Sequence, residues 1–108
     1  MKKGEIWVLS LPFSEGREQR GMRPGLVIAD TTLGMIFTIP LTSHMQALRY
    51  QHTIEIKKSE LNGLDKDSIA LLFQMQSLDK RRFVSKIGEI EASILKIINE
   101  HLRKLFLL

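Results

Sequence analysis

The spacing of the hydrophobic residues changes near residue 91, and this change limits the folds that the chain can adopt. Beyond that point the apolar residues recur with the 3.6-residue period of an amphipathic helix. They are Ile94, Leu95, Ile97, Ile98, Leu102, Leu105 and Phe106. The acidic residues Glu89 and Glu91 before this segment and the basic residues Arg103 and Lys104 at its end suit the helix dipole. We therefore predict one C-terminal helix over Glu91–Leu107.

The chain before this helix is a series of short apolar and β-branched segments separated by turn residues, which is typical of strands. Strands are predicted at residues 5–11, 25–29, 35–42, 52–56, 68–75 and 84–88. Polar loops are predicted at residues 12–22 and 43–51, and a helical turn at residues 77–83. The second strand is continuously apolar and should be buried on both faces, whereas Pro40 indicates a bulge or an edge in the third. The predicted fold class is α+β but mostly β, a strongly bent antiparallel sheet with a C-terminal helix.

Length and composition favour a single cytoplasmic domain over residues 1–108. A chain of 108 residues, 44% hydrophobic and 26% charged, is typical of one globular domain. It has no cysteine, which excludes disulfides and thiolate chemistry. Its first residues lack the apolar run of a signal peptide, and no segment approaches the ~20 apolar residues of a membrane span. We expect a soluble cytoplasmic protein without a membrane partner.

The chain is basic, with 16 Lys and Arg against 12 Asp and Glu and a net charge of +4. A small basic domain attracts polyanions such as nucleic acids. Because many small proteins are basic without a specific reason, the charge favours nucleic-acid binding but does not require it.

Five motifs occur in a fixed order along nearly the whole chain. They are Gly4–Val8, Glu18–Pro24 (of the form E-Q-x-G-x-R-P), Ile39–Ser43, Gln74–Arg82 and Ile87–Gly88. Together they resemble the MazF/PemK toxin family, and the second motif is the most specific of them. The resemblance implies an SH3-like small barrel that forms a homodimer. It also implies the toxin of a type II toxin–antitoxin system, a sequence-specific endoribonuclease that cuts single-stranded RNA without a metal or cofactor. The implied partner is an antitoxin whose disordered tail covers the RNA groove.

Two residues are the candidates for catalysis. The Arg23 guanidinium can bind two phosphate oxygens and stays charged at any working pH, and Pro24 restricts the backbone of Arg23 to extended conformations. Thr42 matches the catalytic threonine of the family, and its hydroxyl can both donate and accept a hydrogen bond. Without the resemblance, Arg23 could equally pair with a carboxylate and Thr42 could cap a loop.

Further residues are candidates for RNA contact rather than chemistry. The first loop should close over the bound strand, although it could also be an ordinary solvated charged loop. Gln74 is predicted on a strand facing the groove, with a partly buried structural amide as the alternative. The predicted RNA-binding residues are Arg17, Glu18, Gln19, Arg20, Ser43 and Gln74.

The chain departs from part of the family at Leu71 and Phe73, where some members carry an arginine and an acidic residue. The carboxylate-based mechanism of those members is therefore not available, and the general base is left open. His44 is a speculative base because imidazole exchanges protons near neutral pH. His44, His52 and His101 do not form a metal-ligand pair on any one predicted element.

Two alternatives remain from the sequence. One is a toxin on the same fold that poisons DNA gyrase through its C-terminal helix. The other is a catalytically weak homologue that binds RNA or an antitoxin without turnover.

Overall fold

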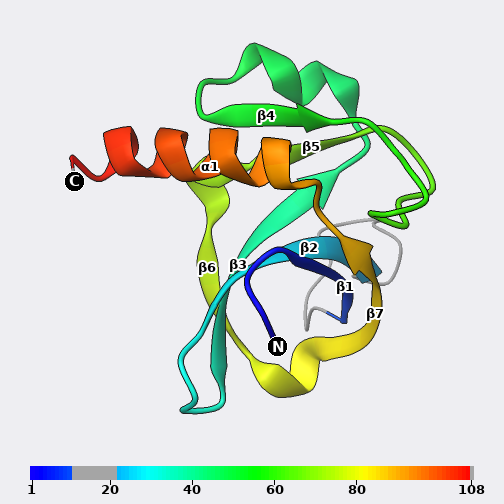
Figure 1. Ribbon diagram of the computed structural model, residues 1–108, viewed down its shortest axis with the longest axis vertical. Helices are drawn as coiled ribbons and strands as arrows, with labels where there is room; N and C mark the ends of the chain where they lie inside the picture. Colours follow the sequence, from blue (N-terminus) through cyan, green and yellow to red (C-terminus); the bar gives the residue numbers. More distant parts are fainter. Residues whose placement is uncertain (11–21, 108) are drawn as a thin grey trace.

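The computed structural model describes residues 1–10 and 22–107, which form a seven-stranded antiparallel sheet and one α-helix (Figure 1). The strands are β1 Glu5–Ser10, β2 Met22–Asp30, β3 Met35–Thr42, β4 Thr53–Ile56, β5 Ser68–Leu71, β6 Gln76–Asp79 and β7 Phe83–Glu89. Three short 3-10 helices connect them: η1 Met45–Arg49, η2 Leu72–Gln74 and η3 Lys80–Arg82. The α-helix α1 spans Ala92–Leu105. The predicted fold class, mostly β with a C-terminal helix, is confirmed.

Strand β3 is the centre of the sheet. The strand order is β4-β5-β3-β2-β1-β7, and β6 pairs with β3 beside this path. On the side away from β2, β3 pairs with β6 through Met35–Thr38 and then with β5 through Leu41 and Thr42. Pro40 lies where β3 changes its partner from β6 to β5. Because proline has no backbone N–H, no hydrogen-bond donor is left without a partner at this position. The irregularity in the β2–β3 ladder falls instead between Val27 and Ala29.

The sheet does not close into the small barrel that the resemblance implied. Within residues 1–10 and 22–107, no ladder joins β7 to β6 or to β4. The chain passes from β6 to β7 through η3 (Figure 1). In this turn the Asp79 carboxylate accepts a hydrogen bond of 2.8 Å from the backbone N–H of Arg81. This capped turn separates the two strands, so the sheet is bent but open.

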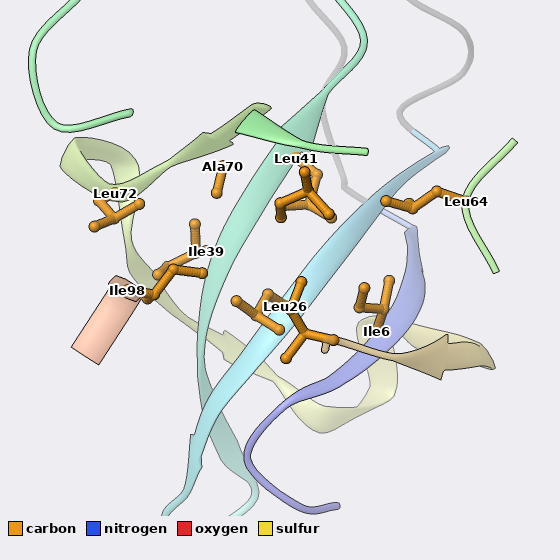
Figure 2. Close-up of a cluster of buried hydrophobic side chains, with 10 residues drawn as sticks. Ile6, Leu26, Ile39, Leu41, Leu64, Ala70, Leu72 and Ile98 are labelled. Atoms are coloured by element: carbon orange, nitrogen blue, oxygen red, sulfur yellow. The ribbon is translucent and has the colours of Figure 1, made fainter. Parts of the chain in front are cut away.

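The main core lies between the sheet and α1. Ile6, Leu26 and Ile39 from three neighbouring strands meet Ile98 of α1 there, and all four are completely buried (Figure 2). A second cluster on the other face contains Leu9, Val27, Ile36 and Phe83, with Trp7 packed against it. Because Leu26 and Val27 are neighbours on β2 and belong to different clusters, β2 is buried on both faces there, as predicted; Ala29 is exposed.

The helix packs by its predicted apolar stripe. Ile94, Leu95 and Leu102 support the buried Ile98, whereas Ile97 and Phe106 are about half exposed. Arg103 and Lys104 occupy the last turn, as the dipole favours. In the part of the chain that the structure describes, no helix is long and apolar enough to cross a bilayer.

Three local predictions were wrong. Residues 77–79, predicted as part of a helical turn, belong to β6 because they pair with Met35–Phe37 of β3; only Lys80–Arg82 form the turn. The strand predicted for residues 68–75 ends at Leu71, so Gln74 is the last residue of η2 rather than a strand residue. The loop predicted for residues 43–51 contains η1.

Candidate functional site

Arg23 and Thr42 lie at facing positions of neighbouring antiparallel strands. The β2–β3 ladder pairs Leu26 with Ile39 and Gly25 with Pro40, and the same register continued by two residues sets Arg23 opposite Thr42. Facing residues of an antiparallel pair project to the same side of the sheet, and alternate residues share a face.

A small cavity confirms that these two residues come together. It has a volume of about 160 Å³ and is lined by Met22, Arg23, Pro24, Leu41, Thr42, Ser43 and His44. Two predicted catalytic residues and one predicted RNA-binding residue, Ser43, therefore line one hollow. His44, the speculative base, lines it as well.

Thr42 is held in place by its surroundings. Its side chain is only 9% exposed, and its Oγ1 accepts a hydrogen bond of 3.2 Å from the backbone N–H of His44. A hydroxyl that accepts this bond can still donate its own proton. The hydroxyl therefore keeps its own proton available for a hydrogen bond to an anionic or hydroxyl ligand in the cavity.

A second cavity of about 400 Å³ extends the site. It shares Met22, Arg23, Pro24 and Ser43 with the small one and is closed on its far side by Gly63, Leu64, Asp65, Lys66 and Ser68; Val8 and Ile87 complete its lining. Sequence reasoning missed Asp65 and Lys66, because nothing in the turn at residues 57–66 indicates that it lies against β2. Both side chains are exposed, so a ligand can reach a carboxylate and an ammonium group here.

The far wall of this cavity is positioned by Asn62, which is completely buried. Its Nδ2 donates to the carbonyl of Lys57 at 2.9 Å and to Oε1 of Glu91 at 3.2 Å. Its Oδ1 accepts from the backbone N–H groups of Ser59 and Leu64, each at 3.0 Å. All the usual hydrogen-bonding capacity of the amide is used, so the turn has one well-defined conformation.

Two glycines allow the same turn to lie directly against β7. A Cβ atom on Gly63 would come within 2.0 Å of the Ile87 carbonyl oxygen, and one on Gly88 within 2.4 Å of the Leu61 carbonyl oxygen. Gly63 also has a φ of 70°, which side-chain-bearing residues rarely adopt. The close approach carries Asp65 and Lys66 to the cavity.

Gln74 is not brought to these cavities. It is exposed and lines a separate hollow of about 490 Å³ together with Tyr50, Gln51, His52 and Phe73. The Phe73 ring is about half exposed and meets the Tyr50 ring edge to face at 6.1 Å. Arg17, Glu18, Gln19 and Arg20 lie outside the described residues.

Two further arginines, Arg49 and Arg81, have partners within the chain. Arg81 forms an ion pair of 2.9 Å with Asp79, and the hydrogen bonds from Arg81 lower the pKa of Asp79 to about 2. Arg49 donates to the Tyr50 hydroxyl at 3.3 Å. Neither residue lines the cavities that contain Arg23.

The site can bind a phosphodiester. A guanidinium and two hydroxyls border one small hollow, and an adjoining larger one has an ammonium group at its edge. Such donors stabilise negative charge that develops on phosphate oxygens. The larger volume would accept a neighbouring nucleotide.

Comparisons with known proteins show the family to which this sequence is similar. Residues 2–106 match the model of a family described as PemK-like, MazF-like toxin of type II toxin-antitoxin system. A protein named endoribonuclease MazF from Staphylococcus saprophyticus is 30% identical over 103 residues, which cover 92% of this chain and 85% of that protein.

Solved structures share the fold. A crystal structure of MazE–MazF from Deinococcus radiodurans matches with a TM-score of 0.77 and 25% identity, over 98% of this chain and 95% of the other. An endoribonuclease in complex with its cognate antitoxin, from Mycobacterial species, matches with a TM-score of 0.71 and 14% identity, over 100% of this chain and 94% of the other.

Proposed function

The chain belongs to the PemK-like, MazF-like family of toxins of type II toxin–antitoxin systems, and from this premise we propose that it is a metal-independent endoribonuclease that cleaves single-stranded RNA at a short sequence. The observation that supports the proposal is that Arg23 and Thr42, from two neighbouring strands, line one small cavity. We also propose that it acts in the cytoplasm, where its mRNA substrates are.

The reaction requires an internal displacement at phosphorus. The 2′-oxygen attacks the phosphorus and loses its proton to a base, the bond from phosphorus to the 5′-oxygen breaks, and the 5′-oxygen takes up a proton. The products are a 2′,3′-cyclic phosphate and a 5′-hydroxyl. Arg23 stabilises the negative charge on the phosphate oxygens, and Thr42 orients the phosphate or the 2′-hydroxyl by hydrogen bonding.

We assign the proton-accepting role to His44. His44 is one of the residues that line the same small cavity as Arg23 and Thr42, and an imidazole nitrogen can accept a proton. A carboxylate next to Gln74 is excluded because Phe73 occupies that position. Replacement of His44 by alanine should therefore lower the rate of cleavage.

The path of the RNA follows the adjoining cavity. Lys66 at its edge supplies a cation for a flanking phosphate, and Asp65 supplies an acceptor for base N–H donors. Ser43 borders both cavities and can contact the strand between them. Arg17, Glu18, Gln19, Arg20 and Gln74 are further proposed contacts, and Gln74 would meet RNA that extends beyond the two cavities.

The proposed partners are a cognate antitoxin and a second copy of this chain. One of the matching structures is an endoribonuclease in complex with its cognate antitoxin, and another is a MazE–MazF complex. An antitoxin with a disordered acidic tail would inhibit by occupying the same basic cavities as the RNA.

The decisive experiment measures cleavage of a long unstructured RNA in the presence of EDTA. We expect cleavage by the wild-type protein and a loss on the order of 10²–10³ in kcat for Arg23→Ala, the usual effect of removing a donor to a developing anion. Arg81→Ala is the matched control, because it removes the same charge from an arginine that is paired with Asp79 outside the cavities. It should cleave at the wild-type rate.

The ends of the fragments distinguish the mechanism from its alternatives. Cyclic phosphates and 5′-hydroxyls are expected at one short sequence. RNA that stays intact while it binds in a salt-dependent manner would instead identify a binding homologue without turnover. An equal loss in Arg23→Ala and Arg81→Ala would show that only the overall charge matters.

One observation favours a second candidate function, a gyrase poison. The end of α1 is apolar and exposed, with Phe106 52% and Leu107 91% accessible. If this end binds gyrase, Phe106→Ser and Leu107→Ser will abolish toxicity and Arg23→Ala will not. The nuclease predicts the opposite result for both changes.

A further inference from the structure

Two aromatic side chains that the proposed chemistry does not use present their rings to solvent side by side. Tyr50 is 51% exposed and Phe73 is 45% exposed. Their rings meet edge to face, with centroids 6.1 Å apart and an interplanar angle of 66°. With Gln51, His52 and Gln74 they line an aromatic hollow of about 490 Å³. Phe73 is also a position at which the sequence departs from part of the family, so the hollow is a feature of this chain.

The side chains of the aromatic hollow suit an unpaired nucleobase. Every base has a flat π face that stacks on an aromatic ring, whatever its identity. Gln51 and Gln74 are exposed, and each amide has donors and an acceptor for the edge of a base. Among the described residues, the lining includes no carboxylate that would repel the phosphates of a strand. We propose that this hollow binds one base of the single-stranded RNA, stacked on Phe73; this inference rests on the proposed function and adds a second contact region to its site.

Phe73 rather than Tyr50 supplies the face on which the base stacks. The Arg49 guanidinium lies over the Tyr50 ring, 5.2 Å from its centroid, and donates to the Tyr50 hydroxyl at 3.3 Å. An edge-to-face contact occupies at most one face of either ring, so Phe73 keeps a face for the base. The hydroxyl takes one of the five N–H donors of Arg49, and the others can bind a phosphate of the same nucleotide.

Backbone hydrogen bonds hold the aromatic hollow in shape before any RNA binds. The Leu72 N–H donates to the His52 carbonyl at 3.0 Å, which ties the start of η2 to the segment after η1. The Thr53 hydroxyl donates to the Tyr50 carbonyl at 2.9 Å, and the Tyr50 N–H donates to the Ala47 carbonyl at 3.0 Å. Because the site is formed in advance, little ordering is needed when a base binds.

Two segments of the chain connect the aromatic hollow to the proposed nuclease site. Ser43 and His44 line the small cavity, and η1 leads directly from them to Tyr50. Ser68 lines the larger cavity at the start of β5, and η2 follows the end of that strand. A strand of four residues spans about 10 Å. A short stretch of RNA can therefore extend from the larger cavity to the aromatic hollow.

The test measures the binding of a fluorescent 2′-O-methyl RNA oligonucleotide of mixed sequence by fluorescence anisotropy. This probe has no free 2′-hydroxyl, so the result does not depend on whether the protein cleaves RNA. We expect Phe73→Leu to weaken binding on the order of tenfold, because leucine keeps the apolar bulk but has no ring on which a base stacks. The slope of affinity against salt concentration should stay the same, because no phosphate contact is lost.

Phe37→Leu is the matched control for this experiment. It makes the same change at a phenylalanine that is 42% exposed and lies outside the lining of the aromatic hollow. We expect this variant to bind the oligonucleotide like the wild type.

A second variant reports on stacking directly. Phe73→Trp keeps an aromatic face and should retain the affinity of the wild type. A base stacked on the introduced indole should quench its fluorescence when the oligonucleotide binds. The wild type, whose single tryptophan is Trp7, gives the background signal.

Three results would overturn the proposal. They are wild-type affinity in Phe73→Leu, quenching in Phe73→Trp no greater than that of the wild type, and a loss of dimer mass in Phe73→Leu at unchanged RNA affinity. The third would show that a second copy of the chain covers the rings. Failure of the nuclease proposal is recognised separately, because it leaves unmodified RNA intact whatever the oligonucleotide binds.

Discussion

At the scale of residues, the site depends on two side chains that the sheet register sets opposite one another. The proposed role of Arg23 depends on its charge and on its position at the start of β2. The pairs Leu26–Ile39 and Gly25–Pro40 of the β2–β3 ladder fix that position. Thr42 depends more on its surroundings, because its hydroxyl is buried and already accepts one backbone hydrogen bond. The two residues should therefore respond differently to conservative replacement.

Thr42→Val and Thr42→Ser separate the hydroxyl from the shape of the side chain. Valine has nearly the same volume but no hydroxyl, so we expect kcat to fall on the order of 10²-fold. Serine retains the hydroxyl and should retain most of the activity. Steady-state cleavage of a short RNA with a fluorophore and a quencher measures both, with circular dichroism as the control for folding. Equal activity in the two variants would contradict a role for the hydroxyl.

At the scale of elements, the sequence correctly predicted the strands and the helix that have a clear hydrophobic pattern of their own. Residues 35–42 were predicted as a strand with the limits that β3 has, because apolar and β-branched residues fill them between clear turn residues. Residues 77–79 were predicted wrongly because their strand conformation comes from pairing with β3, about 40 residues away in the chain. Arg23 and Thr42 could be found through motifs, but Asp65, Lys66 and the pair His52–His101 are brought together only by tertiary packing.

The turn that carries Asp65 and Lys66 should loosen when Asn62 is replaced. Asn62→Ala leaves the Lys57 carbonyl and the N–H groups of Ser59 and Leu64 without their partner, which costs about 1–3 kcal/mol. We expect a lower free energy of unfolding and a higher KM for RNA. Urea unfolding and cleavage kinetics measure these, and Asn99→Ala, at a half-buried position of α1 away from this turn, is the matched control. Wild-type values for Asn62→Ala would refute the role assigned to this amide.

The hydrogen bonds of Glu91, which connect the turn around Asn62 to the start of α1, should make a contribution to stability that is lost in acid. Burial raises the pKa of Glu91, but hydrogen bonds from the Ser59 hydroxyl, a backbone N–H and the Asn62 amide outweigh it, so this pKa lies below its ordinary value of 4.5. A lowered folded-state pKa gives stability that is present above pH 4.5 and is lost as the pH falls through the folded pKa. Glu91→Gln should remove this part of the pH dependence.

The measurement for Glu91 is the free energy of urea unfolding between neutral and acid pH. The wild type should lose its advantage over Glu91→Gln as the solution becomes more acid. A constant difference between the two proteins over this range would show that the carboxylate contributes nothing through its ionisation.

At the scale of the whole molecule, the described residues leave several large apolar side chains in solvent. Phe37 on β3, Val84 on β7 and Ile97 on α1 are each between 42% and 54% exposed. A protein of this size gains stability when such surfaces are covered by another chain. The open sheet also leaves β4 and β7 at the ends of the strand order.

We expect the protein to be a dimer in solution. Light scattering coupled to size-exclusion chromatography should give twice the chain mass of 12.4 kDa, and dilution should lower it. A mass of one chain at every concentration would contradict the proposed homodimer.

The position of Trp7 gives the molecule a built-in optical probe. It is the single tryptophan of the chain, and it packs edge to face against Phe83 in the cluster on the side away from α1. Tryptophan fluorescence therefore follows the unfolding of the cluster around Trp7, whereas far-ultraviolet ellipticity at 222 nm follows the unfolding of the helix α1. Coincident transitions in the two signals would mean that the layers unfold as a single cooperative unit. Separated transitions would mean that the helix can detach while the cluster around Trp7 persists.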